Sequence, residues 1–405
     1  MSINNNFYSV VNSLVQQGTG GNIAVTDHAS FIDFGKQLEG VNGMDIANNF
    51  MAALANRIAQ VVELYRGYTG DYVDLYRGNI EYGQTIEQIM YNWYESNAAG
   101  WTQLNDGETF GTYTISKPQI KVNFFEKENA YDIEKTIQIE MLKKAFTSEA
   151  EMNSFMSGIF GMFTNSNEYV RETARINMIT GMIAYSFAAH TKKNIAPGQT
   201  SNAMNSIYDL RRCYAADTGD TTLNTKTTEG LLHDEKFVKY STATIKKIKE
   251  KMTKRSKIFS MSGEIDTFTP LNAQNTYISA GLKTAIDSYI INTAHYPGGA
   301  DVLNLDAKPV PYWQSAASPY KIAATVPESV QSSGVTSISK DGILCVVFDD
   351  WACGEYTSVQ TMDISPYDAK HRCWQYIFHG LCRYVSNVDA NFVIFYVSDP
   401  AAATE

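Results

Sequence analysis

A cysteine and two histidines near the end of the chain come nearest to a catalytic arrangement. In the stretch HRCWQYIFHGLC, His371, Cys373 and His379 share one side of a predicted strand, because side chains on a strand alternate with a period of two. An imidazole beside a thiol can activate it as a nucleophile, which would give a cysteine/histidine hydrolase. Polar residues packed in a strand are far more common than such pairs. A hydrolase is therefore the least favoured of the functions considered.

Two other short stretches carry groups that bind metals or phosphates in other proteins. Asp349 and Asp350 follow an apolar strand and have the carboxylates that a metal site or an acid–base pair needs. A turn at the strand end explains them more simply. The glycine cluster between Gly18 and Gly21 has no strand before it, so a flexible arm is favoured over a phosphate-binding loop.

Motifs of the main enzyme classes are absent from the sequence. It contains no GxGxxG, no Walker lysine loop, no HExxH and no GxSxG. The odd number of cysteines argues against a complete disulfide framework, and their spacing fits no zinc site. Reduced, mostly buried thiols are expected at Cys213, Cys345, Cys353, Cys373 and Cys382. The sequence thus predicts a protein that is not an enzyme, with no catalytic residue, no cofactor and no metal.

The composition is that of a globular chain with an acidic balance. Of the 405 residues, 44% are hydrophobic, enough for one or more cores, and 19% are charged. The formal net charge of -10 is opposite in sign to that of a simple nucleic-acid-binding protein. The start MSINNNFYSVVNSL shows no secretory signal, and no apolar run reaches the roughly 18 residues of a membrane span. A cytoplasmic product without a membrane segment is expected.

One helical stretch departs from this acidic balance. Residues 236–257 contain eight lysines and one arginine, a charge density that could contact DNA phosphates. The apolar residues Phe237, Ile245, Ile248 and Met252 recur at helical spacing, which instead favours an amphipathic helix with a solvated lysine face. The second interpretation is favoured, and the first stays open.

The N-terminal third is predicted to lack a compact core. Residues 1–44 are rich in Asn, Gln, Gly and Ser, which indicates an extended arm. A helix over 45–67 follows, because apolar residues recur at helical spacing and Gly67 suits a C-terminal cap. Residues 68–135 combine many Tyr, Asn and Gly with short β-like runs such as KPQIKVNFF, and predict a long two-stranded excursion. Two strands alone are marginally stable, so such an excursion is either functional or wrongly assigned.

The next segment is predicted to contain a strand and a long helical element. Tyr131–Ile139 alternates apolar and polar residues, which is typical of a strand. Capping-box patterns beginning at Ser148 and, more weakly, at Asn165 predict helices over about 149–163 and 166–190. These two helices could also form one bent unit. Residues 192–339 mix turns with further helices.

The chain ends in β structure. The six apolar residues FVIFYV (392–397) run without a break, which is typical of a strand buried on both faces. The turn SNVDAN is expected to fold this strand back on residues 371–385 as an antiparallel pair.

Three stretches and the order of the elements resemble a known family. The stretches are GQTIEQI (83–89), YDIEKTIQIEMLKKAFTS (131–148) and CRYVSNVDANFVIFYV (382–397). They are similar to the major capsid proteins of tailed bacteriophages with the Hong Kong 97-type fold, especially those of small short-tailed phi29-like phages. The resemblance implies an α+β fold with an N-terminal arm (1–44), a peripheral-domain helix (45–67), an extended loop (68–135), a peripheral domain with a spine helix (136–191), an axial domain (192–339) and terminal peripheral-domain strands (340–405).

The resemblance also implies what covers the terminal strand pair, namely the helix 166–190 on one face and either the helix 45–66 or the extended loop of a neighbouring subunit on the other. It implies a function and partners as well. Such a protein assembles with itself, as hexamers and pentamers, into the icosahedral shell of a virion that encloses double-stranded DNA without sequence-specific binding. Portal and scaffolding proteins are the further expected partners, no membrane is expected, and assembly is expected in the bacterial host cytoplasm. Another phage ring protein, a connector or a tail tube, is the alternative.

Some members of this family link their subunits covalently through lysine and asparagine side chains. The excursion contains Lys117, Lys121 and Lys127, but the sequence identifies no partner asparagine. Noncovalent assembly is therefore expected.

Overall fold

The computed structural model of the chain contains two compact units. One comprises Met1–Gln84, Lys127–Ala174 and Glu355–Tyr384, and the other comprises Thr85–Glu126, Arg175–Gly354 and Val385–Glu405. The residues described are 12, 15–16, 24–37, 47–49, 51–52, 68–81, 84–93, 106, 120–126, 128–141, 149–192, 205–291, 305–331 and 336–400.

The first unit is built on a four-stranded sheet. Its strands follow the order β1 (Tyr76–Asn79), β11 (Cys353–Ile364), β12 (Cys373–Ser386) and β4 (Glu128–Gln138). β12 runs antiparallel to β4 along the whole of β4, with Cys373 opposite Gln138 and Arg383 opposite Glu128. The strand predicted over 131–139 is confirmed as β4, which begins three residues earlier.

Residues from the N-terminal third pack against this unit. Trp374 on β12 donates from its indole nitrogen to the Asn48 side chain at 2.6 Å, and the Tyr376 hydroxyl donates to the Met51 carbonyl at 2.9 Å. Residues 47–49 and 51–52 are helical, and the other residues of the helix predicted over 45–67 lie outside the described residues.

The arm predicted over 1–44 was expected to be extended, and for the described part that prediction is wrong. Residues His28–Gln37 form the helix α2, whose Phe31 and Phe34 are buried. Asp27 and Ser30 hold its first turn by reciprocal hydrogen bonds between the side chain of each and the backbone amide of the other. The low apolar content of the arm as a whole concealed this local pair of buried aromatic residues.

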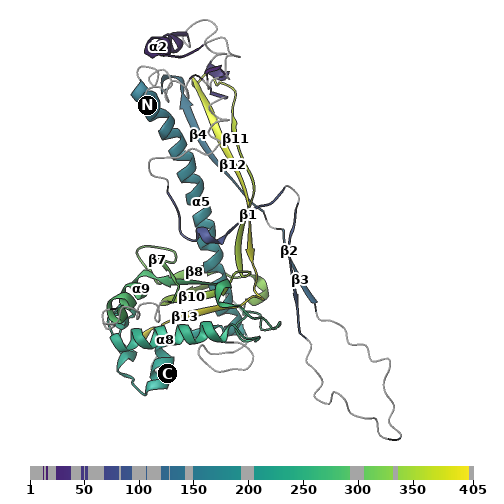
Figure 1. Ribbon diagram of the computed structural model, residues 1–405, viewed down its shortest axis with the longest axis vertical. Helices are drawn as coiled ribbons and strands as arrows, with labels where there is room; N and C mark the ends of the chain where they lie inside the picture. Colours follow the sequence, from purple (N-terminus) through teal and green to yellow (C-terminus); the bar gives the residue numbers. More distant parts are fainter. Residues whose placement is uncertain are drawn as a thin grey trace. The chain divides into compact units, whose positions relative to one another are not determined.

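A single helix, α5 (Glu149–Lys192), replaces the two helices predicted here (Figure 1). Its 44 residues correspond to about 66 Å at 1.5 Å per residue. Asn165 does not start a second helix, because its side-chain oxygen accepts from the Tyr68 amide at 2.8 Å instead of capping its own chain. The alternative that both stretches belong to one helical unit is therefore confirmed, and its predicted bend stays a prediction. Among the described residues, no helix is long and apolar enough to cross a membrane.

The second unit is built on a five-stranded sheet. Its strands follow the order β5 (Ile207–Asp209), β13 (Phe392–Tyr396), β10 (Ile343–Asp349), β6 (Gln274–Ser279) and β7 (Lys308–Val310). β10 is antiparallel to both β13 and β6, whereas β5 and β7 are attached by parallel pairing. Four helices accompany this sheet, namely α6 (Leu210–Thr218), α7 (Thr228–Leu232), α8 (Glu235–Lys251) and α9 (Ala280–Ile286).

Both faces of β13 are covered within the chain, as its apolar run predicted. Val393 and Phe395 belong to one core cluster with buried residues of α6, α8 and α9. On the alternate face, Phe392 stacks on Phe348, and Tyr396 contacts Phe187 of α5 edge to face at 5.2 Å. The helices after residue 205 therefore provide the cover that was expected from the helix 45–66 or from a neighbouring subunit.

The predicted antiparallel pair between 371–385 and 392–397 is wrong. β12 pairs with β11 and β4, whereas β13 pairs with β10 and β5. The burial patterns explain the choice, since every residue of β13 is buried and β10 is buried over its first six residues, whereas β12 alternates with half-buried positions. As a result, the segment 340–405 contributes strands to both units.

In the described part of the predicted excursion 68–135, two strands form a separate pair. β1 and the start of β4 join the four-stranded sheet, while β2 (Ile86–Tyr91) and β3 (Ile120–Phe125) form a two-stranded antiparallel sheet. The remaining short elements are η1 (Val73–Leu75), η2 (Thr222–Thr225), η3 (Leu271–Ala273), the π-helical η4 (Asp287–Ile291), β8 (Ile322–Thr325), η5 (Glu328–Val330) and β9 (Ser337–Lys340).

Candidate assembly interface

The cysteine and histidines singled out in the sequence do not form a catalytic pair. His371 contacts Asp368 at 2.5 Å, and His379 lies on the four-stranded sheet between Asp132 at 2.6 Å and Asp363 at 3.5 Å. Cys373 and His379 are six residues apart on β12, which corresponds to about 20 Å along a strand. The arrangement fits strand residues with acidic neighbours.

The acidic and cysteine candidates also occupy structural positions. Asp349 accepts from the Thr269 hydroxyl at 2.5 Å and from the Trp351 amide at 2.8 Å, and Asp350 accepts from the Asn275 side chain at 2.6 Å. Both therefore organise the turn after β10. All five cysteines are free, and three of them are buried. Among the described residues, no three His, Cys, Asp or Glu side chains are grouped to hold a metal ion.

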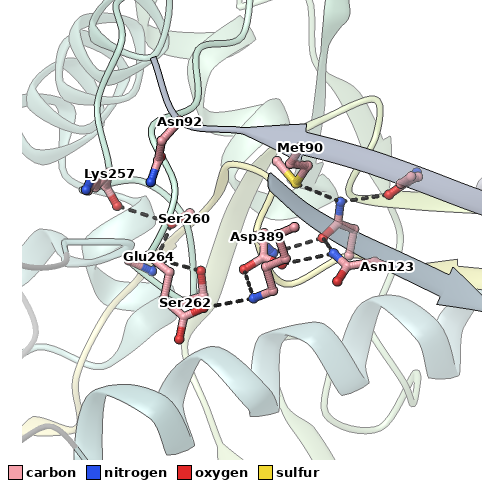
Figure 2. A network of polar contacts seen from close by, with 12 residues as sticks. Met90, Asn92, Asn123, Lys257, Ser260, Ser262, Glu264 and Asp389 are labelled. Carbon is pink, nitrogen blue, oxygen red and sulfur yellow. Dashed lines mark hydrogen bonds and ion pairs between the residues drawn. The ribbon is translucent and has the colours of Figure 1, made fainter. Parts of the chain in front are cut away.

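The β2–β3 hairpin has a polar face that is bound to the rest of its unit (Figure 2). The Lys121 ammonium lies 2.8 Å from both the Asp389 and the Glu264 carboxylates. The Asn123 amide donates to Asp389 at 2.9 Å and to the side chain of Asn387 at 3.2 Å. Residues in the turn between β12 and β13 thus hold this face of β3.

β2 is attached to the same turn. The side-chain nitrogen of Asn387 donates to the side-chain oxygen of Gln88 at 2.7 Å, and the side-chain nitrogen of Gln88 donates to the backbone carbonyl of Trp351 at 3.3 Å. Gln88 lies opposite Asn123 in the hairpin register, so these two amides and Lys121 share the half-buried face, whereas Glu87 lies on the other face opposite Phe124.

The ion pair in this network favours the charged form of both partners. Burial raises the pKa of Asp389, but hydrogen bonds from Lys121, Asn123 and Ser262 outweigh it and hold that pKa below its usual value. Burial lowers the pKa of Lys121, but hydrogen bonds to Asp389 and Glu264 outweigh it and raise that pKa. The polar face is therefore fixed by a charged pair at neutral pH.

The opposite face of the hairpin is apolar and exposed. Its side chains alternate with the polar ones, and Phe124 is 60% exposed. A sheet with one wet face normally turns its apolar side inward and its polar side to water, so this hairpin is inverted. We call the exposed surface the outer face, and its apolar members are Ile89, Tyr91, Ile120, Val122 and Phe124.

Sequence reasoning found the alternation in β3 but not its orientation. The alternation in KPQIKVNFF places Ile120, Val122 and Phe124 on one side of a strand. The turn SNVDAN contains the polar partners Asn387 and Asp389, and the sequence predicts no further role for them. Their near-complete burial could have been suspected from the apolar strand that follows them, but nothing in the sequence links them to β3.

The basic stretch 236–257 forms the predicted amphipathic helix, α8, with a short continuation. Its predicted apolar residues Phe237, Ile245, Ile248 and Met252 are all buried in the core of the second unit. Lys247, Lys251 and Lys254 are exposed. The geometry matches a solvated lysine face, and contact with DNA stays a hypothesis.

Comparison with known families identifies the family of this chain. Residues 9–396 match the model of a family described as phi29-like phage major capsid protein. The chain belongs to this family. It is therefore a structural protein of a phage capsid, as the resemblance in its sequence implied.

A curated relative supports the capsid family. The chain is 27% identical over 125 residues to the major capsid protein of Bacillus phage GA-1. This match covers 30% of the chain and 25% of that relative, so the chain spans about a quarter of the length of the curated relative it matches.

Solved structures agree on the fold of the capsid protein. One neighbour belongs to the capsid structure of Staphylococcus phage Andhra, with a TM-score of 0.52, 10% identity, and coverage of 84% of this chain and 87% of that chain. Another belongs to a structure describing the head fiber and inner core protein of native bacteriophage P68, with a TM-score of 0.52, 8% identity, and coverage of 83% and 87%. The capsid protein thus has the predicted α+β, Hong Kong 97-type fold.

Proposed function

We propose that this capsid protein assembles with itself, as hexamers and pentamers, into a closed icosahedral shell around a double-stranded DNA genome. In that shell, the outer face of the β2–β3 hairpin packs on a neighbouring copy. The observation that carries the proposal is the inversion of the hairpin, in which Gln88, Lys121 and Asn123 are bound inward while the five apolar side chains of the outer face are exposed.

The inversion is costly for an isolated chain. Exposed apolar side chains lose about 25 cal/mol for each Å² that stays in water, and monomeric proteins seldom keep such patches without a partner. Copies of the same chain are the partners that a shell supplies in quantity. A contact between unlike surfaces of identical copies forms a closed ring when its rotation is a whole fraction of a turn, and hexamers and pentamers need such a contact.

The remaining parts of the proposal follow from capsid function. The protein acts without catalysis, encloses DNA without reading its sequence, and assembles in the cytoplasm of the bacterial host with portal and scaffolding proteins. Its net charge of -10 suits a container that does not bind its polyanionic content tightly. The boundaries given for the N-terminal arm, extended loop, peripheral domain and axial domain stay predictions.

Electron microscopy of the purified protein, with the scaffolding protein of its phage, tests the proposal. We expect closed shells from the wild-type chain. We expect folded but unassembled protein from Phe124→Asp, which changes only the outer face, and wild-type shells from Tyr312→Asp, which changes an exposed aromatic residue of the same unit away from the hairpin. Rings of a single fixed size would contradict shell formation and favour a connector or a tail tube. Normal shells from Phe124→Asp would remove the outer face from the interface.

A further inference from the structure

A pocket with aromatic walls lies beside the β2–β3 hairpin. Its volume is about 420 Å³. Ile89 and Tyr91 of the outer face form one wall, so pocket and outer face are one continuous surface. We call it the aromatic pocket, and its main apolar lining residues are Ile89, Tyr91, Trp93, Ile265, Phe268 and Trp351.

The walls of the aromatic pocket are held in place. The rings of Trp93 and Phe268 meet edge to face with centroids 5.7 Å apart. The Arg255 guanidinium lies 5.8 Å from the centre of the Trp93 ring, and it binds Asp266 at 2.6 Å. The Asp266 amide donates to the side chain of Asn92 at 3.0 Å, which ties the end of β2 to the same wall. The pocket is therefore preformed, and its aromatic side chains are nonetheless exposed, with Trp351 53% in solvent.

The charged groups around the pocket are already engaged. Asp266 is paired with Arg255, and Asp349 accepts hydrogen bonds from Thr269 and Trp351. A pocket for a small polar ligand normally presents a few convergent polar groups that orient it. Here the lining is mostly apolar, and it includes Trp and Tyr, two of the residue types that dominate the binding energy of protein–protein contacts. The chemistry selects a bulky apolar side chain as the occupant.

We propose that the aromatic pocket receives a bulky apolar side chain from a second copy of this chain and anchors the contact between copies. This inference rests on the proposed function and adds the place where the contact between copies is anchored. The argument for a second copy is continuity, because the pocket shares Ile89 and Tyr91 with the face assigned to the neighbouring subunit. In a heterologous contact, a hollow on one copy is filled by a projection of the next, without a requirement for self-complementarity.

Assembly of pocket variants tests the anchor. Trp351→Ala and Phe268→Ala remove half-exposed rings, so the melting temperature of the unassembled chain should stay close to that of the wild type. We expect each to raise the protein concentration needed for shell assembly about tenfold or more, as truncation of an interface anchor does. Tyr312→Ala, an exposed aromatic residue outside the pocket, is the matched control and should assemble normally. Wild-type assembly by both pocket variants overturns the proposal.

Photo-crosslinking identifies the occupant directly in assembled particles. The full-length chain carries a photoreactive phenylalanine analogue at position 268, and shells are assembled from an equal mixture of ¹⁴N- and ¹⁵N-labelled chains. We expect mixed-isotope crosslinked peptides, which only contacts between copies produce. Crosslinks confined to one chain, or crosslinks to scaffolding protein or DNA, overturn the proposal.

Failure of the aromatic pocket as an anchor can be distinguished from failure of the proposed shell-forming function. Failure of the wild-type chain to form shells contradicts the proposed function itself. Shells that form normally when the pocket is truncated leave that function intact and reject only the aromatic pocket as the anchor.

Discussion

Asp389 shows how one side chain can fix the orientation of a hairpin. It is fully buried, and it binds both Lys121 and Asn123 of β3. Removing one partner of a buried polar group leaves the other partly desolvated and unpaired, which costs more than the bond itself contributes. The direction in which the outer face points therefore depends on a small number of polar contacts.

The first prediction concerns the pH range in which this contact holds. The pKa of Asp389 is lowered in the folded state, so its stabilising contribution is complete at neutral pH and is lost as pH falls below about 3.9, through the folded pKa. The pKa of Lys121 is raised, so its contribution is lost only as pH rises above about 10. We expect hydrogen exchange of the β3 amides to accelerate at the acid end before exchange in β10 does.

The variant Lys121→Gln provides the control. Lys121 is about one-third exposed, so solvent screens its contacts. We therefore expect its loss to weaken β3 protection by about 1 kcal/mol at neutral pH, less than the roughly 1.5–3 kcal/mol of a charged hydrogen bond. The acid dependence of β3 exchange should also be flatter in this variant. Equal exchange of β3 in the variant and the wild type would show that Lys121 and Asp389 do not hold the hairpin.

The second prediction concerns Ile394 at the centre of β13. Its side chain is fully buried, opposite Val346 of β10 and Ile207 of β5. A carboxylate there has no partner, and burying an unpaired charge costs several kcal/mol. We expect Ile394→Asp to give insoluble or unfolded protein. Ile394→Val removes one methylene, should cost about 1 kcal/mol and should still assemble. Normal shells from Ile394→Asp would contradict the burial of β13.

At the scale of elements, the sequence predicts the secondary structure and burial of a segment well. It predicts the packing partner of that segment less well. β4 and the burial of β13 follow from local periodicity, and so does the amphipathic character of α8. The partner of β13 does not, because pairing joins residues about 50 positions apart and the turn SNVDAN equally suits a hairpin or a change of sheet. The outer face has the same difficulty, since alternation identifies two faces without saying which one meets water.

The third prediction concerns the continuity of α5. Gly181 lies within this helix, and a Cβ atom added there would meet nothing within 4 Å. Glycine inside a helix costs roughly 0.5–1 kcal/mol relative to alanine, because it loses more backbone freedom on folding. We expect Gly181→Ala to raise the free energy of unfolding by this amount. The midpoint of urea unfolding should rise accordingly, and the slope of that free energy against urea concentration should not change.

A glycine that cannot be replaced serves as the comparison. Gly342 has φ of 79°, and an added Cβ would lie 2.1 Å from the carbonyl oxygen of Val397. We expect Gly342→Ala to lower the urea midpoint. A lower midpoint for Gly181→Ala would mean that α5 depends on a distortion at this position.

At the scale of the whole molecule, the chain combines an interior that is covered by its own residues with an apolar surface that stays exposed. The core of the second unit is closed by its own helices, whereas the outer face and the aromatic pocket stay exposed. A capsid protein must fold before it assembles, so the interior has to be self-sufficient. The sequence could predict the interior because burial follows from apolar runs. It could not place the interface, because that surface depends on which polar groups hold the hairpin.

The fourth prediction concerns the lysine face of α8. The chain has a net charge of -10, so its long-range field opposes the approach of DNA, and Lys247, Lys251 and Lys254 supply only a local positive patch. We expect filter binding at moderate salt to retain no duplex DNA. Retention that weakens with salt, and that is lost in a Lys247→Gln, Lys251→Gln, Lys254→Gln variant but not after three similar changes at Lys36, Lys321 and Lys370, would instead identify α8 as a DNA contact.

The last prediction concerns how the copies are joined. Of the four lysines in the predicted excursion 68–135, Lys117 and Lys127 lie outside the described residues, Lys135 belongs to β4 of the four-stranded sheet, and Lys121 is held between two carboxylates. Formation of an amide link needs an uncharged amine, and the raised pKa of Lys121 keeps its amine protonated at neutral pH. We therefore expect mature particles, boiled in detergent and reducing agent, to give one band of the size of the intact chain. A ladder of higher bands would show covalent joining. If Lys121→Arg then removed the ladder, Lys121 would have to leave Asp389 during maturation.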